Sequence, residues 1–292
     1  MPGRARGPPD ELKRTRTYAQ SGSAMAIGHI FWNEYIRLLD SGENVDVLAL
    51  GDSWFHYPFN NLLTPLHAAL EGPTIYVIGA NGARADELCR GSWRANFNKL
   101  LLQFPSIRLV ALSAGGNDFA GVGDLDDRIL APDCRGATAL AQCYRAGEPG
   151  AVFDAVGDAY RTIVETVAAL RSDVTILVHN YDYAIPDGRT PLGMRSWLKL
   201  PMDNARVPLA GAPQDGLRRE IVGDLIDQLT VRLSDLEDAT NGPNRPRVEL
   251  VWSAGTLADA AWANELHPKP SGFEKLVTQC WSGPSRRALG LP

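Results

Sequence analysis

Five short apolar runs alternate with segments of helical periodicity, and this alternation constrains the fold more than any other feature of the chain. Runs of five or six residues bounded by turn signals indicate strands that are covered on both faces. A strand–helix–strand order predicts a parallel sheet between two layers of helices. The expected strands are Val45–Leu50, Thr74–Ile78, Ile107–Leu112, Val174–His179 and Val248–Trp252.

Helices are expected between these strands because apolar residues recur there at spacings of three and four. A helix over about 25–40 is also expected before the first strand, where Phe31, Tyr35 and Leu38 fall at helical spacing. The remaining expected helices cover about 61–71, 84–104, 156–171, 222–236 and 271–281.

Two segments, 121–150 and 186–213, break the alternation and are too long for plain connectors. The second contains five prolines. Loops of this length are usually lids or binding loops, and irregular packing on the core is the other interpretation. We therefore expect one domain over residues 25–292 with these two inserted loops, preceded by a flexible basic tail over residues 1–24.

Composition excludes several classes of partner. The chain has 29 Lys and Arg against 34 Asp and Glu, a formal net charge of −5, which gives no electrostatic case for nucleic acid. No apolar stretch approaches the roughly 18 residues of a membrane span, and no signal peptide is recognised, so a cytoplasmic location is expected. A disulfide between Cys134 and Cys143 would argue against that location. No cysteine pair has the spacing of zinc ligands.

A Gly-Asp-Ser-Trp motif at 51–54 directly follows the first expected strand. It places Ser53 at the carboxyl edge of the sheet, where open α/β sheets bind their ligands. Serine there acts as a nucleophile when a base takes its proton and donors stabilise the oxyanion. Candidates follow three other strands in order: Gly82, Asn117 and His267. Each motif alone is common, but the four together, in this order, indicate an active site.

These four segments resemble the SGNH/GDSL hydrolase family over about residues 45–273. In that family the serine lies in a GDS turn, and the histidine ends a late DxxH segment. The resemblance implies a three-layer α/β/α sandwich with a flavodoxin-like sheet of five parallel strands in the order 2-1-3-4-5. It also implies Ser53 as nucleophile, His267 as general base, and an oxyanion hole formed by Ser53, Gly82 and Asn117. No metal or organic cofactor is implied.

Elementary chemistry agrees with these roles. Gly82 has no side chain, so a substrate carbonyl can approach its N–H, and the amide of Asn117 is a second donor. One such donor is typically worth about 10²–10³ in rate. The imidazole of His267 titrates, when unperturbed, near pH 6.5, as a general base needs.

The chain departs from the family pattern at Asn264, where the family has an acid three residues before the histidine. Its carbonyl oxygen can hold one imidazole tautomer but cannot stabilise imidazolium with a negative charge. Glu265, Asp259 or a backbone carbonyl could replace the acid. We expect Ser53 and His267 to act as a dyad oriented by Asn264 or by a backbone carbonyl.

Aromatic and polar residues near the expected site are candidates for the substrate pocket. Those that follow the serine can line the pocket or enter the core, and we expect two of residues 54–57 to be core. The segment 179–183, after the fourth strand, can contact substrate or form a buried polar network that braces its loop. The candidates are Trp54, His56, Tyr57, Tyr181, Asp182 and Trp197.

The sequence therefore predicts a serine esterase of the carboxylesterase or lysophospholipase kind, acting on a small or lipid-like ester through an acyl-enzyme. An acyltransferase would use the same residues. A binding or scaffold protein on a hydrolase fold is the third interpretation, because Asn264 could mark a weakened site. The sequence does not indicate an oligomeric state.

Overall fold

The sheet is parallel throughout. The computed structural model describes residues 27–57, 60–191, 194–209 and 216–292. Within those ranges six strands lie in the order β1-β3-β2-β4-β5-β6, and every neighbouring pair is parallel. The strands are β1 (Ile30–Trp32), β2 (Val47–Gly51), β3 (Ile75–Gly79), β4 (Leu109–Ser113), β5 (Thr175–His179) and β6 (Arg247–Val251).

The expected five strands in the order 2-1-3-4-5 correspond to β2–β6, which keep those neighbours, but the number of strands was wrong. The added strand β1 pairs with β3 where a helix over 25–40 was expected. The chain turns at Asn33, whose φ is 54° and whose side-chain amide donates to the Gly79 carbonyl at 2.8 Å. Only the end of the expected helix forms, as α1 (Tyr35–Ser41). The apolar spacing from Phe31 onward fits a strand followed by a helix equally well.

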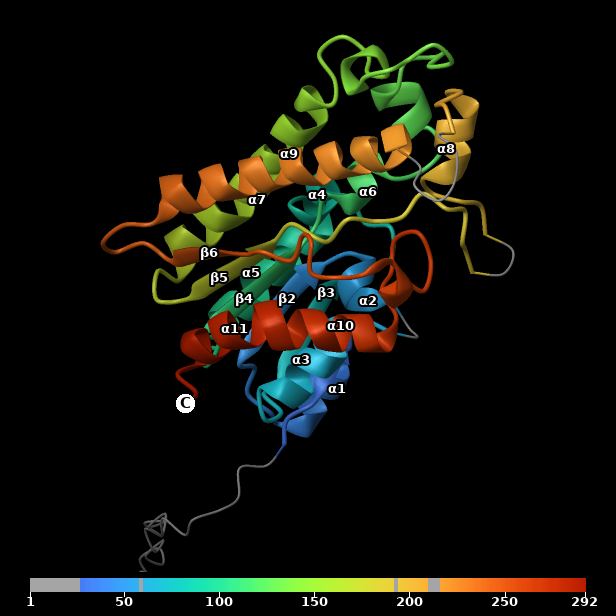
Figure 1. The fold of residues 1–292 in the computed structure, drawn as a ribbon. Coiled ribbons are helices and arrows are strands. Elements are labelled where there is room, and N and C mark those ends of the chain that lie inside the picture. Colours follow the sequence, from blue (N-terminus) through green and yellow to red (C-terminus); the bar gives the residue numbers. More distant parts are fainter. Residues whose placement is uncertain (1–26, 58–59, 192–193, 210–215) are drawn as a thin grey trace, which may run out of the picture.

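Two layers of helices cover the sheet, as Figure 1 shows. One layer contains α5 and α9, which contact strands, and α4 and α7, which pack against them. The other contains α3, α10 and α11, whereas α1 lies in the first layer, where the Tyr35 hydroxyl donates to Gln103 of α5 at 2.6 Å. Their bounds are α3 (Leu63–Ala69), α4 (Ala85–Leu88), α5 (Gly91–Gln103), α7 (Gly150–Leu170), α9 (Gly216–Thr240), α10 (Pro270–Leu276) and α11 (Ser282–Leu289).

Two expected helices differ in extent from the observed ones. The segment 84–104 is divided into α4 and α5, because Gly91 adopts a φ of 53° at the junction. The expected helix over 271–281 begins at Pro270 and continues through a π-helical turn at Val277–Trp281 into α11. The remaining α-helices of the described ranges are short and follow strands or loops: α2 (Ser53–His56), α6 (Gly116–Phe119) and α8 (Lys199–Asn204). Single π or 3₁₀ turns occur at Leu125–Ile129, Leu140–Gln142 and Asp259–Ala261.

The three central strands end level with one another, which positions the site. Gly51 at the end of β2 is in register with Gly79 of β3 and with Ser113 of β4. Gly79 has a φ of 142°, and a Cβ built there would lie 1.8 Å from the Gly51 carbonyl oxygen. A larger residue therefore cannot occupy position 79. The loops after all three strands begin at the same edge of the sheet.

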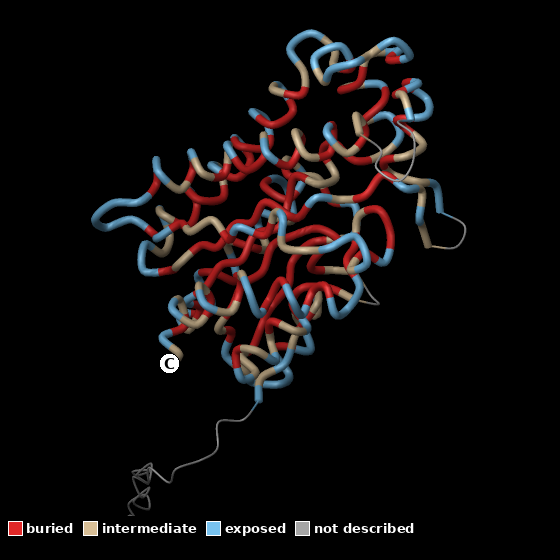
Figure 2. The backbone as a smooth tube through the Cα atoms, viewed as in Figure 1, coloured by how far each residue is buried: buried red, intermediate tan, exposed pale blue. Residues whose placement is uncertain are grey.

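The core lies on both sides of the sheet. All residues of β2, β3 and β4 are buried, whereas the outer faces of the helices are exposed (Figure 2). Among the helices of the described ranges, none combines the length and apolar character that a membrane crossing needs. The expected tail over residues 1–24 lies outside the described residues.

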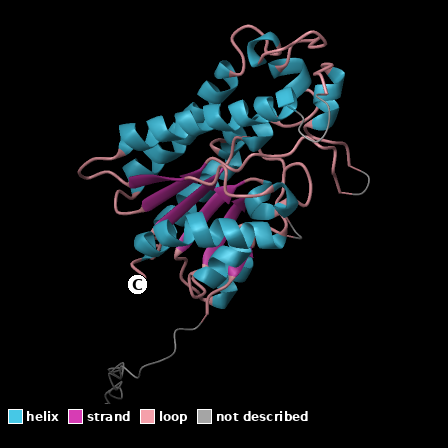
Figure 3. Ribbon diagram, in the orientation of Figure 1, coloured by secondary structure: helices cyan, strands magenta, loops and turns pink. Residues whose placement is uncertain are grey.

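The two inserted segments pack against each other at one end of the molecule. Cys134 donates its N–H to the Ala205 carbonyl at 2.8 Å, and the amide of Asn204 donates to Asp126 at 2.7 Å. Much of both segments is loop (Figure 3). Cys134 is a free thiol near Cys143, with its Sγ 3.8 Å from the Cys143 carbonyl oxygen. Parts of the second segment, 192–193 and 210–213, lie outside the described residues.

Candidate active site

Ser53 begins α2 directly after β2, in a tight strand-to-helix turn. The preceding Asp52 caps this helix, and its carboxylate accepts the Trp54 N–H at 3.0 Å. This capping holds the short helix in place at the sheet edge. The Ser53 side chain is largely buried, with the residue 9% exposed.

The Ser53 hydroxyl contacts the imidazole of His267 from the other end of the chain. Ser53 Oγ lies 2.8 Å from His267 Nε2, and His267 Nδ1 lies 3.1 Å from Asn264 Oδ1. The three side chains thus form one hydrogen-bonded row. This is the spacing that nucleophile, base and orienting group need for catalysis.

Backbone contacts identify which tautomer of His267 this row requires. Asn264 Oδ1 accepts the N–H groups of Leu266 at 2.9 Å and of His267 at 2.8 Å, so this atom is the amide oxygen. An oxygen can only accept, and Nδ1 of the ring must therefore carry the proton that it donates to Asn264. Nε2 is left with a lone pair that accepts the Ser53 O–H.

Aromatic side chains cover the His267 ring. Tyr57 stacks on it with ring centres 4.2 Å apart and an angle of 9°, and Trp197 meets it edge-on at 6.0 Å. Burial disfavours the charged imidazolium and lowers the pKa of His267 to about 4. His267 is therefore neutral, and able to accept a proton, at neutral pH.

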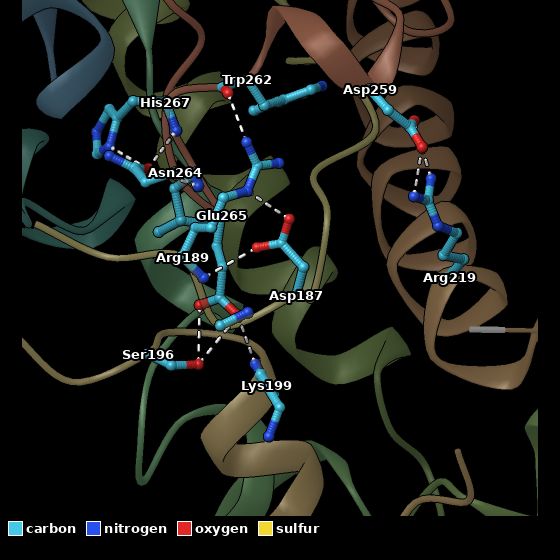
Figure 4. A network of polar contacts seen from close by, with 12 residues as sticks. Asp187, Arg189, Ser196, Lys199, Arg219, Asp259, Trp262, Asn264, Glu265 and His267 are labelled. Carbon is cyan, nitrogen blue, oxygen red and sulfur yellow. Dashed lines mark hydrogen bonds and ion pairs between the residues drawn. The ribbon is translucent and has the colours of Figure 1, made fainter. Parts of the chain in front are cut away.

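The two acids considered as substitutes for the family's aspartate contact other groups (Figure 4). Asp259 is exposed and pairs with Arg219 at 2.6 Å. Glu265 is fully buried, and its two oxygens accept hydrogen bonds from Ser196 and from the backbone of residues 188 and 197–199 at 2.7–3.0 Å. Asn264 is the side chain that contacts His267 Nδ1.

Glu265 thereby fastens the second inserted segment to the loop that carries His267. The backbone of Gly188 and of residues 197–199 donates to its carboxylate, and this places Trp197 beside the imidazole. A fully buried carboxylate with this many donors is stable only because each lone pair is satisfied. The sequence did not indicate this role, since nothing in the residues around Glu265 shows which distant backbone N–H groups it meets.

Asp52 is the centre of a buried polar network behind the serine. Its carboxylate accepts the hydroxyls of Tyr181 at 2.7 Å and Ser113 at 2.9 Å, and His179 Nε2 lies 2.9 Å from the Ser113 oxygen. Burial raises the pKa of Asp52 to about 6, although these hydrogen bonds favour its charged form. Burial also lowers the pKa of His179 to about 3. The segment 179–183 thus contributes to a buried network, one of its two interpretations, whereas the sequence indicated no role for Asp52 or Ser113.

The expected oxyanion-hole residues lie at the sheet edge: Ser53 begins α2, Gly82 is in the turn after β3, and Asn117 is in α6 after β4. The Asn117 amide donates to the Ala83 carbonyl at 3.1 Å and to Asp52 at 3.3 Å. Gly82, with a φ of 79°, directly precedes Ala83 and is exposed, and a Cβ added there would meet no atom within 4 Å. Asn117 thus ties the Gly82 turn to the carboxylate beside Ser53. Its 3.3 Å bond to Asp52 is long, so this N–H can be shared with a substrate oxygen.

The six candidate pocket residues occupy different positions. Tyr57 and Trp197 flank His267, whereas His56 is half-buried and hydrogen-bonds to the backbone of Ile78. Asp182 accepts the N–H groups of residues 183, 255 and 257 at 2.7 Å and braces its loop. Of residues 54–57, the first two, Trp54 and Phe55, are the buried ones.

A small cavity of about 30 Å³ adjoins Ser53. Trp54, Tyr181 and Asp182 line it together with residues from α6, α9 and the loop before His267. The Trp54 indole donates to the Leu266 carbonyl at 3.0 Å, which fixes one wall to that loop. Residues of the serine turn, of the segment after β5 and of the loop before His267 therefore all line this one cavity.

A larger hollow of about 660 Å³ lies elsewhere, between α4, α5 and α7. Its charged side chains include Arg84 and Asp118, 3.9 Å apart, and Arg90 and Asp86, 3.5 Å apart. Neither Ser53 nor His267 lines it. No cluster of three or more metal-ligating side chains occurs in the described ranges. The candidate nucleophile therefore borders the smaller cavity, and His267 contacts that nucleophile at 2.8 Å.

No protein-family model matches the sequence, and no curated protein matches it. Solved structures do match. The lipase Lip_vut3 from a goat rumen metagenome is 11% identical, with 84% of this chain and 97% of that chain covered and a TM-score of 0.52. A Streptococcus pneumonia protein, provisionally described as a platelet activating factor, is 14% identical over 84% and 86% of the two chains, with a TM-score of 0.51.

A protein from Parabacteroides merdae, provisionally described as a GDSL-like lipase, is also similar, with 13% identity, coverage of 86% and 97%, and a TM-score of 0.45. The chain has the fold of the SGNH/GDSL hydrolases. This agrees with the resemblance of its motifs. At such identities the likeness concerns the fold, and function has to be argued from the site.

Proposed function

We propose that this protein is a serine hydrolase that cleaves carboxylic esters through an acyl-enzyme at Ser53. The observation that carries the proposal is the row from Ser53 Oγ through His267 to Asn264 Oδ1, with distances of 2.8 and 3.1 Å. The row gives the serine a base with its lone pair directed at the hydroxyl. Lip_vut3, which shares the fold, is described as a lipase, and lipases cleave carboxylic esters, which supports the proposal.

The reaction proceeds in two displacement steps. His267 Nε2 takes the Ser53 proton while Oγ attacks the ester carbonyl, and the resulting oxyanion is stabilised by donors from Ser53, Gly82 and Asn117. The C–O bond to the alcohol then breaks, and the imidazolium returns its proton to the leaving oxygen. Water then attacks the acyl carbon while His267 takes one of its protons. The bond between that carbon and Ser53 Oγ breaks, the imidazolium returns its proton to Oγ, and the acid leaves.

Asn264 holds the Nδ1–H tautomer without adding a negative charge. Imidazolium forms transiently in both steps, and a neutral amide stabilises it less than a carboxylate. Asp52 lies behind the serine and is held by its own donors, so it organises the turn and Asn117 rather than exchanging a proton with substrate.

The proposal is tested with an organophosphonate probe and a panel of p-nitrophenyl esters. Intact-mass analysis should show one adduct, mapped to Ser53, and Ser53→Ala and His267→Ala should each abolish turnover. Ser106, whose hydroxyl donates to the Val45 carbonyl before β4 begins, lies at the opposite edge of the sheet and provides the matched control. Ser106→Ala should retain both labelling and turnover.

Product analysis in the presence of added alcohols separates hydrolysis from acyl transfer. Accumulation of a new ester instead of the acid would indicate a transferase that uses the same residues. A protein with neither labelling nor serine-dependent turnover on any ester would be a binding protein, and the proposal would be wrong.

A further inference from the structure

We propose that the cavity beside Ser53 is an acyl pocket that admits an acetyl or propionyl group and excludes longer chains. This inference rests on the proposed function and names its substrate class: esters of short, uncharged carboxylic acids. It departs from the lipid-like substrate that the aromatic residues near the serine suggested.

The position of the cavity identifies which part of the ester it receives. Both Ser53, which would attack the carbonyl carbon, and Asn117, a donor to its oxygen, border the cavity. The substituent on that carbon therefore points into it. The leaving alcohol departs on the side of His267, which must deliver its proton and is flanked by Tyr57 and Trp197.

The cavity volume limits the size of the acyl group. Its volume of about 30 Å³ is small beside the roughly 300–1,000 Å³ of sites for drug-sized ligands. A water-sized group needs about 10–15 Å³ by the same kind of measure, so the space holds about two such groups. The methyl substituent of an acetyl group or the ethyl substituent of a propionyl group fits, and the propyl substituent of a butyryl group requires the walls to move.

The walls are held by the core and resist such movement. Phe119 of α6, Ile226 of α9 and Trp262 of the loop before His267 are 3%, 2% and 1% exposed. The Tyr181 ring is fixed by its 2.7 Å hydrogen bond to Asp52. Close-packed side chains of this kind yield little space without strain or backbone shifts.

The lining also selects against charged acyl groups. Besides the apolar walls it contains the carboxylates of Asp52 and Asp182, whose oxygens already accept hydrogen bonds from protein donors. Among the residues that the structure describes, no cationic side chain lines the cavity. A dicarboxylic half-ester would bury a second anion there without a counter-charge, which is strongly unfavourable.

The test measures kcat/KM for p-nitrophenyl acetate, propionate, butyrate and hexanoate. One methylene more than a pocket accommodates costs about 10–200-fold, so we expect a drop of that size between propionate and butyrate. Succinate half-esters should be poorer than butyrate. Hexanoate turnover equal to or faster than acetate turnover would overturn the inference while leaving the proposed function intact.

Two alanine variants on α9 test which residue sets the limit on acyl chain length. Ile226→Ala enlarges the cavity and should raise the butyrate-to-acetate ratio of kcat/KM about tenfold or more. Ile221→Ala removes the same atoms from a fully buried site on α9 that does not line the cavity, and the ratio should stay unchanged. If Ile226→Ala fails to fold, Ile226→Val tests the same shift with a smaller change.

Equal ratios in the Ile226 and Ile221 variants would overturn the assignment of the acyl pocket. Absence of Ser53-dependent turnover on every ester, together with absence of phosphonate labelling, would instead overturn the proposed function. The wild-type chain-length series, the ratio between variants and the labelling result therefore distinguish the two failures.

Discussion

The protonation of His267 depends on burial and on the neutral amide of Asn264. Because burial lowers the pKa of His267 to about 4, the imidazole stays neutral as pH falls from 7 to about 5 and becomes protonated near 4. We predict that kcat/KM for p-nitrophenyl acetate falls on an acid limb near pH 4 that belongs to His267, below any smaller change near pH 6 that follows protonation of Asp52. An acid limb near pH 6.5 would contradict this.

Asn264→Asp is expected to move the acid limb of the kcat/KM profile to higher pH. A carboxylate at the Oδ1 position, 3.1 Å from Nδ1, favours imidazolium and raises the histidine pKa by about 1–3 units. It also stabilises the imidazolium formed during the reaction, so kcat at pH 8 should rise. The measurement is the pH profile of kcat/KM for both proteins, and coincident limbs would show that Asn264 does not contact the catalytic ring in solution.

Removal of the amide should have a smaller effect than removal of the reacting groups. Asn264→Ala lowers kcat modestly, because His267 remains stacked on Tyr57, whereas Ser53→Ala and His267→Ala abolish turnover. Steady-state kinetics on one ester compares the three variants. An Asn264→Ala loss as large as the other two would show that the amide is essential rather than orienting.

The candidate site residues that the structure brings together are those that follow strand ends in the sequence. Ser53, Asn117 and His267 lie in motifs whose distance from an apolar run is visible in the chain. The buried network could not be predicted this way, because the Asp52–Tyr181 hydrogen bond joins residues 129 positions apart. The role of Glu265 was missed for the same reason, since its donors come from a segment that is remote in sequence.

At the scale of elements, Glu265 holds the segment before α8 against the histidine loop. Glu265→Ala leaves buried N–H groups of residues 188 and 197–199 without acceptors, at about 1–3 kcal/mol each. We predict a large loss of unfolding free energy and faster proteolysis within residues 188–199. Urea unfolding and limited proteolysis measure the two effects.

Asp259→Asn is the matched control for that prediction. Asp259 lies six residues earlier, is exposed, and pairs only with Arg219 among the contacts described for its carboxylate, so its loss should cost about 0–1 kcal/mol. Equal effects of the two substitutions would contradict the role of Glu265 as the anchor of the segment.

The elements that the sequence predicted best are those with long, uniform patterns. β2–β6 and the stripes of α7 and α9 were visible as apolar runs or helical periodicity. β1 was not, because three residues stabilised by pairing with β3 carry too little pattern of their own. The division between α4 and α5 depends on the backbone at Gly91, which periodicity does not report.

At the scale of the whole molecule, buried titratable groups make stability depend on pH. His179 is fully buried, with its pKa lowered to about 3, and the unfolded chain binds a proton there below about pH 6.5. Between these values the unfolded state binds more protons, so the free energy of unfolding falls as pH decreases. Asp52 acts in the opposite direction, because its pKa is raised to about 6 and its contribution is lost as pH rises through that value.

A histidine variant isolates one of these contributions. His179→Gln keeps a side-chain donor toward Ser113 but cannot titrate, so its stability should fall less than that of the wild type between pH 6.5 and pH 5, by about 2 kcal/mol. Urea unfolding at the two pH values measures the difference. Each protein is compared with itself at the two pH values, so a packing loss caused by the substitution cancels. His29→Gln, at an exposed position, is the control and should retain most of the wild-type dependence. If His179→Gln and the wild type lose the same free energy over this interval, His179 is not a buried neutral histidine in the folded protein.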